Sequence, residues 1–249
     1  MLSAGKIKII NALKIKKHRD ENALFVAEGT KTVGDIFPYF DCKWLIATEE
    51  WLKENPCLQA EEIITTTSEM LKKISGLKTP SSVLAVFKKP DYQIDFRQIS
   101  NSLSLVLDEV QDPGNLGTIV RIADWFGIEN IVCSENSADI FNSKTIRATM
   151  GAVARVRVHY TSLTDFFPKL PPSLPIFGTY MNGENIYQEN LPDEAIIVIG
   201  NEGNGISKNV EKFINKKLRI PNFPQKRKTS ESLNVAVATA IVCSEFRKR

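Results

Sequence analysis

The sequence has few of the residues from which metal sites, disulfide frameworks and histidine-based active sites are built. Its 249 residues include four cysteines, none in a CxxC pair, and two histidines, His18 and His159, far apart in the chain. Single cysteines among apolar residues are typical of reduced thiols in a cytosolic protein, so we expect a cytoplasmic protein without a bound metal ion. Neither histidine lies in a recognisable nucleophile motif, which argues against a histidine-based triad.

Several other signals are missing. No run of about eighteen apolar residues occurs, so we expect no membrane span. The basic N-terminus is not followed by an apolar segment with a small-residue cleavage site, so we expect no signal peptide. There is no Walker A sequence, and the glycines near residue 200 lack the GxGxxG spacing, which leaves little support for a nucleoside triphosphate or NAD site.

Charge is nearly balanced, with a formal net charge of +3, but it is unevenly distributed. The segment from Met1 to Arg19 contains six basic residues and no acid, and the segment from Ser207 to Lys228 contains eight basic residues against Glu211 alone. Basic clusters on a near-neutral protein suggest a polyanion such as RNA or DNA as partner, although for each cluster taken alone a solvated face is the better explanation.

Strands alternating with helices predict an α/β protein with a mainly parallel sheet in its C-terminal part. We expect a small α/β domain over residues 1–90, a linker over 91–101 and a second domain over 102–249. The pattern also predicts one helix over residues 6–17, a strand over 153–158, and a last helix that starts at Ser232 with Ser232 as its N-cap.

A buried strand followed by a glycine-rich polar loop lies near the end of the chain. Ala195 to Ile199 is an unbroken apolar run that fits a strand buried on both faces, and GNEGNG follows from Gly200. Open α/β sheets hold ligands outside the carboxyl ends of such strands. Glu202, the carboxylate in this loop, is therefore a site candidate, with a tight turn before a helix as the alternative.

Two further loops follow strands in the second domain, at Asp112-Pro-Gly-Asn and before Ser232-Leu-Asn. In a parallel sheet these loops share one edge, which would bring together a set of polar side chains: Asn115, Arg121, Glu202, Ser232 and Asn234. The set has no histidine or cysteine nucleophile, so it suits the positioning of a polar substrate beside a cofactor that carries the reactive group. Singly, Asn115 also fits a turn, Ser232 a helix cap and Arg121 a surface arginine.

Three segments resemble, in order, the three motifs of the SpoU/TrmH family of RNA 2′-O-ribose methyltransferases in the SPOUT superfamily. They are LDEVQDPGNLGTIVRIADWFGI from Leu107, IIVIGNEGNGIS from Ile196, and LRIPN…ESLNVAVATAI from Leu218. The stretch from Leu13 to Val33 also resembles the substrate-binding domain that precedes the catalytic domain in many of these enzymes, which is similar to RNA-binding ribosomal proteins.

The resemblance implies an enzyme that uses S-adenosyl-L-methionine to methylate a ribose 2′-hydroxyl, works as a homodimer and carries a deep trefoil knot in its C-terminal domain. It assigns Asn115 and Arg121 to the first motif, Glu202 to the second, and Ser232 and Asn234 to the third. It places the cofactor against a set of largely backbone contacts at Thr179, Gly200, Ile220 and Leu233.

The resemblance leaves the substrate open. The separate N-terminal domain favours large-subunit rRNA, with tRNA as an alternative, and a non-catalytic RNA-binding relative is a third possibility that the intact motif residues argue against. The chain departs from many relatives after Pro221, where Asn222 stands in place of a methionine. A long basic loop, Phe223 to Thr229, follows and could add an RNA contact in place of a cofactor contact.

Overall fold

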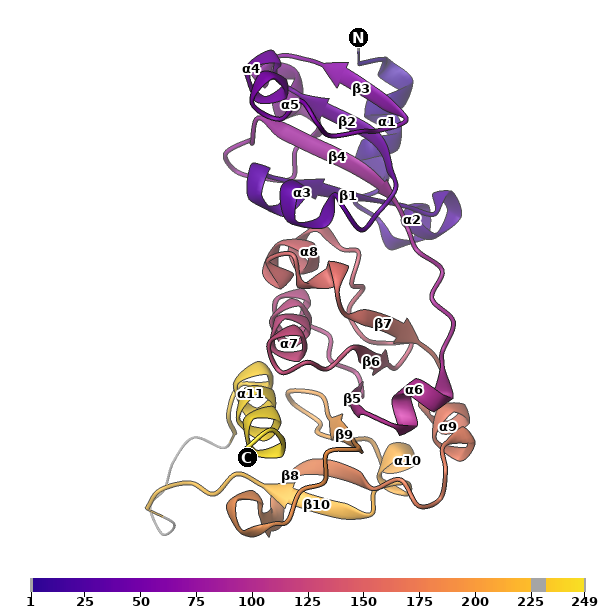
Figure 1. Ribbon diagram of the computed structural model, residues 1–249, viewed down its shortest axis with the longest axis vertical. Coiled ribbons are helices and arrows are strands. Elements are labelled where there is room, and N and C mark those ends of the chain that lie inside the picture. The colour runs from indigo at the N-terminus through magenta and orange to yellow at the C-terminus, as the bar shows by residue number, and fades with distance from the viewer. Residues whose placement is uncertain (1, 225–231, 249) are drawn as a thin grey trace. The chain divides into compact units, whose positions relative to one another are not determined.

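The computed structural model describes residues 2–224 and 232–248, which form two compact units (Figure 1). The first unit comprises the residues up to Asp91 together with Asp139–Ala154, and the second comprises Tyr92–Ala138 and the residues from Arg155 onward. Both units contain a sheet with helices, so the α/β class predicted from the sequence is confirmed. No helix in the described residues is long and apolar enough to cross a membrane.

The first unit is built on a four-stranded sheet with the order β1-β4-β2-β3. Its strands are β1 (Leu24–Glu28), β2 (Cys42–Ala47), β3 (Glu62–Thr65) and β4 (Val83–Lys88). β4 pairs antiparallel with both β1 and β2, and β2 pairs parallel with β3. The helices of this unit are α1 (Ala4–Ala12), α2 (Lys16–Asn22), α3 (Thr30–Ile36), α4 (Glu49–Glu54), α5 (Ser68–Ile74) and α8 (Ser143–Thr149).

Alternation along β1 creates two cores, because successive side chains of a strand point to opposite faces. Leu24 and Val26 join Ile10 of α1 and Ile74 of α5 on one face of the sheet. Phe25 points to the other face, where its ring packs against several aromatic rings, those of Phe40, Phe87 and Phe141. Phe141 lies within the segment Asp139–Ala154, and its contact with Phe25 is one of those that join this segment to the first unit.

The single helix expected over residues 6–17 is wrong, because the chain breaks into α1 and α2 around Leu13. Leu13 is buried, and its carbonyl accepts a hydrogen bond at 2.8 Å from the guanidinium of Arg19, which is also buried. Arg19 forms an ion pair with Asp139 at 2.6 Å. The periodicity of the sequence could not reveal this break, because the partner of Arg19 lies 120 residues away.

The second unit contains a six-stranded sheet in which every pair is parallel, with the order β10-β8-β9-β5-β6-β7. The strands are β5 (Leu103–Leu107), β6 (Asn130–Cys133), β7 (Arg157–Tyr160), β8 (Ile176–Asn185), β9 (Ala195–Ile199) and β10 (Lys216–Arg219). β5 and β9 lie at the centre and are buried along their whole length, as the apolar run from Ala195 to Ile199 predicted.

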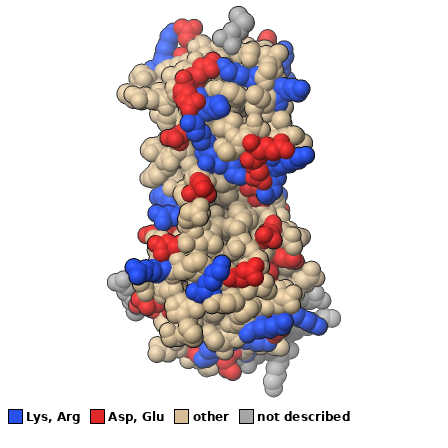
Figure 2. All heavy atoms as spheres, turned by 90° about the vertical axis from the view of Figure 1, so that its right-hand side faces the viewer, with Lys and Arg blue, Asp and Glu red and all other residues tan. Residues whose placement is uncertain are grey.

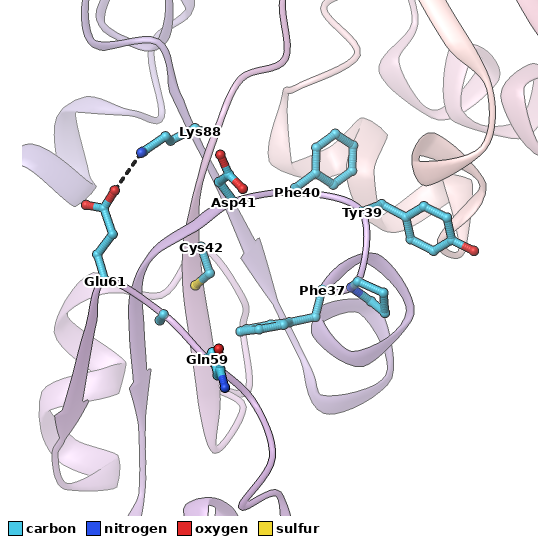
Figure 3. A pocket seen from close by; sticks show the side chains of 10 residues that line it. Phe37, Tyr39, Phe40, Asp41, Cys42, Gln59, Glu61 and Lys88 are labelled. Carbon is cyan, nitrogen blue, oxygen red and sulfur yellow. Dashed lines mark ion pairs between the residues drawn. The ribbon is translucent and has the colours of Figure 1, made fainter.

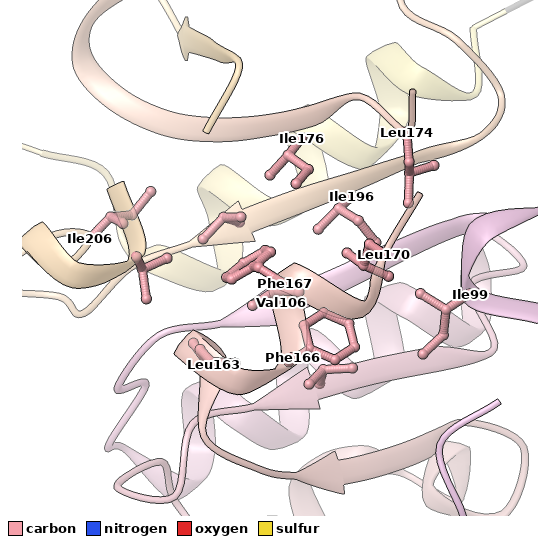
Figure 4. Close-up of a cluster of buried hydrophobic side chains, with 13 residues drawn as sticks. Ile99, Val106, Leu163, Phe166, Phe167, Leu170, Leu174, Ile176, Ile196 and Ile206 are labelled. Atoms are coloured by element: carbon pink, nitrogen blue, oxygen red, sulfur yellow. The ribbon is translucent and has the colours of Figure 1, made fainter. Parts of the chain in front are cut away.

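Helices cover both faces of this sheet. On one face, α6 (Phe96–Ser100), α9 (Leu163–Phe166) and α10 (Lys208–Glu211) contribute Ile99, Phe166 and Val210 to a cluster with Val106 of β5 and Ile196 of β9 (Figure 4). The other face is covered by α7 (Pro113–Trp125) and α11 (Val235–Phe246), which pack against each other. There the ring of Phe246 meets that of Phe177 edge-on at 5.2 Å.

Two more local expectations are wrong. Residues 152–154 form a 3-10 turn, η1, and the strand expected over 153–158 starts only at Arg157. Met150 and Gly151 just before it have positive φ angles of 50° and 88°, so the chain turns where the sequence pattern suggested an extended run. The last helix is capped by Asn234 and not by Ser232, since the Asn234 side chain accepts hydrogen bonds from the N–H groups of Ala236 and Val237.

Candidate active site

The first and second motif loops leave the sheet side by side. Leu107 and Ile199 end β5 and β9 as register partners, and the N–H of Asp108 donates to the carbonyl of Ile199 at 2.8 Å. The strand order reverses next to β5, so the edge formed by these two loops is the position where open α/β sheets bind ligands. The loops of the first two motifs therefore lie next to each other at one edge of the sheet, as expected from the sequence.

A chain of side-chain hydrogen bonds joins all three motifs at this edge. The side-chain amide of Asn115 donates to the Glu202 carboxylate at 2.9 Å. The side-chain oxygen of Asn115 accepts in turn from the amide of Asn234 at 3.1 Å. Asn234 closes the chain as the N-cap of α11. Three residues separated by 87 and 119 positions in the sequence thus share one network.

The backbone of α11 fixes the direction of every hydrogen bond in this network. The Asn234 side-chain oxygen must face the N–H groups of Ala236 and Val237, which can only donate. Its NH₂ group is then left to donate to Asn115, whose own NH₂ group must donate to Glu202. The series ends on an oxygen of the Glu202 side chain that acts as an acceptor, so each donor in it has a partner.

Local turn chemistry places Asn115 at the start of α7. Asp112 is the N-cap of this helix and accepts from the N–H of Asn115 at 2.9 Å, while Pro113 occupies the first turn, where its missing N–H costs nothing. The Asp-Pro-Gly-Asn sequence, expected as a loop, therefore begins the helix. The side chain of Asn115 is left free to reach the neighbouring loop.

A second set of contacts, which the sequence did not single out, holds the loop that carries Glu202. Asn201 donates from its side chain to the carbonyl of Glu109 at 2.8 Å and accepts from the N–H groups of Gly203 and Asn204. Glu109 itself has a positive φ of 59°. The only available signal was the position of Asn201, since asparagine at the start of a polar loop often bonds to its own following backbone.

Arg121 and Ser232 are not part of the network. Both side chains are exposed, and neither forms a hydrogen bond or ion pair with any described residue. Arg121 lies six residues after Asn115 on α7, which places it roughly 9 Å further along the axis and on a different side of the helix. Its guanidinium therefore remains available for a substrate group.

The four candidate cofactor contacts lie on or just after the strands β8, β9 and β10, or just before α11. Thr179 lies where β8 stops pairing with β9, and its hydroxyl donates to the carbonyl of Val198 at 3.3 Å. Gly200 follows β9 and Ile220 follows β10, while Leu233 is 48% exposed just before α11. Thr179 offers a hydroxyl, Gly200 backbone groups, and Ile220 and Leu233 apolar side chains, a set that suits a ligand with both polar groups and an apolar ring, such as a nucleoside.

Gly200 has a role within its own loop. A Cβ atom on Gly200 would lie 2.3 Å from the carbonyl carbon of Gly205, so no other residue fits there without moving the backbone. Asn201 and Gly205 exchange two backbone hydrogen bonds at 3.0 Å, which close the loop around Glu202. The glycine therefore allows the tight closure that fixes the carboxylate.

The pKa of Tyr180, which is next to Thr179 on β8, is raised. Burial, together with the carboxylates of Glu211 and Asp108, raises the pKa of Tyr180 to about 12. The ammonium group of Lys217 lies 4.5 Å from the centre of the ring. Tyr180 stays a neutral phenol at physiological pH, so it is no general base for the reaction.

A cavity of about 520 Å³ lies elsewhere, in the first unit (Figure 3). Its lining includes Phe37, Asp41 and Gln59, with Glu61 and Lys88 paired at 2.5 Å on one side. None of the residues expected in the active site lines this cavity. Volume alone would point here, but the convergent polar network lies at the sheet edge of the second unit, which is the candidate active site. The described residues contain no cluster of side chains that could hold a metal ion.

Comparisons with known proteins identify the family of this chain. The family model described as SpoU rRNA Methylase family matches residues 102–244, more than half of the chain. This protein belongs to the SpoU rRNA methylase family. The prediction from the three motifs is thus confirmed. A second family model, the MRM3-like substrate binding domain, matches residues 4–85.

Relatives and solved structures cover nearly the whole chain. The 23S rRNA (guanosine(2553)-2′-O)-methyltransferase RlmP of Bacillus subtilis is 28% identical over 97% of this chain and 96% of its own. A structure of a putative RNA methyltransferase of the TrmH family from Porphyromonas gingivalis has a TM-score of 0.90 and 38% identity, covering 100% of this chain and 99% of that one. An AdoMet-bound rRNA methyltransferase from Sinorhizobium meliloti has a TM-score of 0.85 and 28% identity, with 100% and 96% covered.

Proposed function

We propose that this protein is an S-adenosyl-L-methionine-dependent methyltransferase that methylates a ribose 2′-hydroxyl of 23S rRNA. The observation that carries the proposal is the Glu202–Asn115–Asn234 network at the carboxyl edge of the sheet, which joins all three family motifs. Family membership, the full-length likeness to a 23S rRNA 2′-O-methyltransferase and the likeness to an AdoMet-bound rRNA methyltransferase support it.

The residues of the chain bind and orient the reacting groups. When bound, S-adenosylmethionine supplies a methyl group made electrophilic by its positive sulfur, and Thr179, Gly200, Ile220 and Leu233 would hold it. Arg121 binds the target phosphate or ribose and stabilises the negative charge that develops on the 2′-oxygen. A free arginine does not lose its proton in proteins, so we assign it no role as a base. Asn115, Glu202, Ser232 and Asn234 orient the ribose.

RNA binding is the proposed task of the N-terminal domain, residues 1–90, joined by residues 91–101 to a catalytic domain over 102–249. The match to a substrate-binding family model supports this division. The basic N-terminal segment contributes less free charge than its sequence suggested, because four of its cations, Lys6, Lys16, Lys17 and Arg19, have carboxylate partners. On the face shown in Figure 2, basic and acidic side chains are likewise interspersed. The basic loop Phe223 to Thr229 lies largely outside the described residues.

Two copies of the chain form the proposed active enzyme, a homodimer. Trp125 is 84% exposed on α7, one turn after Arg121, and Val237 is 50% exposed on α11, which packs against α7. A large apolar side chain beside a catalytic arginine suits a face that a second copy covers. We also propose the deep trefoil knot of the family, supported by the likeness to solved relatives. Four free cysteines, three of them buried, fit the proposed location in the cytoplasm.

Transfer of a labelled methyl group to separated RNAs tests the function. Wild-type protein, labelled S-adenosylmethionine and either unmodified 23S rRNA or tRNA are incubated, and ribose methylation is mapped. Arg121→Ala should lose transfer by at least about 100-fold while its Kd for the cofactor stays within about twofold. Arg97→Ala, an exposed arginine on α6, is the matched control. Transfer to tRNA alone would contradict 23S rRNA as the substrate. Lost cofactor affinity in Arg121→Ala would contradict the proposed role of Arg121 in binding the RNA. Transfer to neither RNA would leave a non-catalytic RNA-binding protein.

A further inference from the structure

Glu109 is held in a backbone conformation that glutamate rarely adopts. Its φ of 59° lies in the left-handed region, where a side chain other than glycine costs roughly 1–2 kcal/mol. Such a conformation persists only when surrounding contacts determine it, and these positions concentrate at functional sites. Glu109 lies in the loop between β5 and α7, six residues before Asn115. The contacts that hold it therefore bear on the active site.

Three contacts from two other loops fix Glu109. Its N–H donates to the Ser134 hydroxyl at 2.9 Å, and its carboxylate accepts from the side-chain amide of Asn136 at 3.1 Å. Both of these residues follow β6. Its carbonyl accepts from the side-chain amide of Asn201 at 2.8 Å, from the loop after β9. The left-handed turn thus aims the carbonyl at the loop that carries Glu202.

Asn201 uses its side chain on two loops at once. While its NH₂ group holds the carbonyl of Glu109, its side-chain oxygen accepts from the N–H groups of Gly203 at 2.9 Å and Asn204 at 3.0 Å. Those two N–H groups directly follow Glu202. The same side chain therefore fixes the tip of the glycine-rich loop and attaches that tip to the loop leading to Asn115.

We propose that Asn201 and Glu109 are positioning residues that set the separation between Asn115 and Glu202. Neither touches a reacting group in this assignment, since both act through the backbone of the two motif loops. A rigid link is needed because an error of about 1 Å in a catalytic array can cost roughly 100-fold in rate. The inference rests on the methyl transfer proposed above.

Substitutions at Asn201 test the hydrogen bond from its NH₂ group separately from those to its side-chain oxygen. Asn201→Asp keeps an oxygen for Gly203 and Asn204 but has no donor for Glu109. Asn201→Ser keeps a shorter acceptor for the loop tip, replaces the NH₂ donor by a hydroxyl on a shorter side chain and adds no charge. Both variants should lower kcat by at least about tenfold, with the Kd for S-adenosylmethionine and the melting temperature nearly retained. Asn204→Ala is a neighbouring control that keeps all three side-chain hydrogen bonds of Asn201, since only the backbone N–H of Asn204 is used.

Substitutions at Glu109 test the left-handed turn. Glu109→Gly keeps the carbonyl direction and removes the strain, whereas Glu109→Val keeps the carbonyl but strongly disfavours the positive φ. We expect kcat to fall at least about tenfold further in the valine variant than in the glycine variant. Equal losses in both would show that the carboxylate, and not the turn, matters, and would overturn the proposal.

The outcomes keep this inference separate from the proposed function. If the wild-type protein transfers methyl groups and the Asn201 variants match it in kcat, the positioning role is wrong while the function stands. If the variants lose kcat only together with melting temperature and cofactor affinity, the contacts merely stabilise the unit and the proposal is also wrong. If the wild-type protein transfers no methyl group to 23S rRNA or tRNA, the function itself fails.

Discussion

Asn234 donates a side-chain hydrogen bond to Asn115 across 119 residues of sequence, at 3.1 Å, while capping the N-terminus of α11 with its side-chain oxygen. One amide thus begins a helix and orients the active-site network. Because the cap uses the oxygen and the network uses the NH₂ group, the two tasks can be separated by mutation.

The Asn234 variants should divide stability from activity. Asn234→Asp keeps the cap and cannot donate to Asn115, so we expect an unchanged melting temperature with a fall in kcat of about tenfold. Asn234→Ala removes both functions and should also lose about 1 kcal/mol of stability, a few degrees in melting temperature. Calorimetry and methyl-transfer kinetics on the two proteins give the comparison. Equal activity in wild type and Asn234→Asp would show that the hydrogen bond is dispensable.

A carboxylate at position 115 should make the activity depend on pH. Asn115→Asp places a second carboxylate next to Glu202, in place of an amide that donates at 2.9 Å. Two such carboxylates share one proton with a raised pKa, so the contact forms at low pH and is repulsive at high pH. The activity of the variant relative to wild type should therefore rise from pH 8 to pH 6. Adding Glu202→Gln restores a donor and should remove this dependence, and a flat profile in the single variant would contradict the network.

The buried ion pair of Arg19 and Asp139 should stabilise the first unit. Their side chains are 3% and 8% exposed, so removing one partner leaves an uncompensated buried charge. We expect Asp139→Ala to lose about 3–5 kcal/mol, against about 0–1 kcal/mol for Asp20→Ala, which breaks exposed pairs. Urea unfolding followed by tryptophan fluorescence reports on this unit in a Trp125→Phe background, since Trp44 and Trp51 lie in it. Similar losses of unfolding free energy in Asp139→Ala and Asp20→Ala would contradict a stabilising role for the buried ion pair.

Stability should fall in mild acid because of His159. Burial is the main reason that the pKa of His159 lies below its usual 6.5, so the folded state favours the neutral ring. A histidine with a lowered folded pKa contributes stability above the unfolded pKa, and this contribution is lost as the pH falls from about 6.5 toward the folded pKa, at up to about 1.4 kcal/mol per pH unit. Melting temperatures between pH 7 and pH 5 should decline less in His159→Gln. An identical slope in both proteins would be evidence against this role.

The sequence by itself determined the class of fold and the family, and it singled out three of the side chains that meet at the sheet edge, Asn115, Glu202 and Asn234. Runs such as Ala195–Ile199 are long and apolar enough to require burial on both faces, and that is local information. Turn signals such as Asp112-Pro113 likewise act over a few residues, so the start of α7 close to Asn115 could be expected.

Only the tertiary structure decided which partners these side chains choose. Arg19 of α2 donates to the carbonyl of Leu13, just after α1, and pairs with Asp139. Asn234, and not Ser232, caps α11, where it also reaches Asn115. Asn201 and Glu109 went unnoticed because their roles depend on a left-handed turn fixed by Ser134 and Asn136 from a third loop. Hydrogen bonds act over about 3 Å in space and carry no trace of their partner in the local sequence, so the fold alone brings them together.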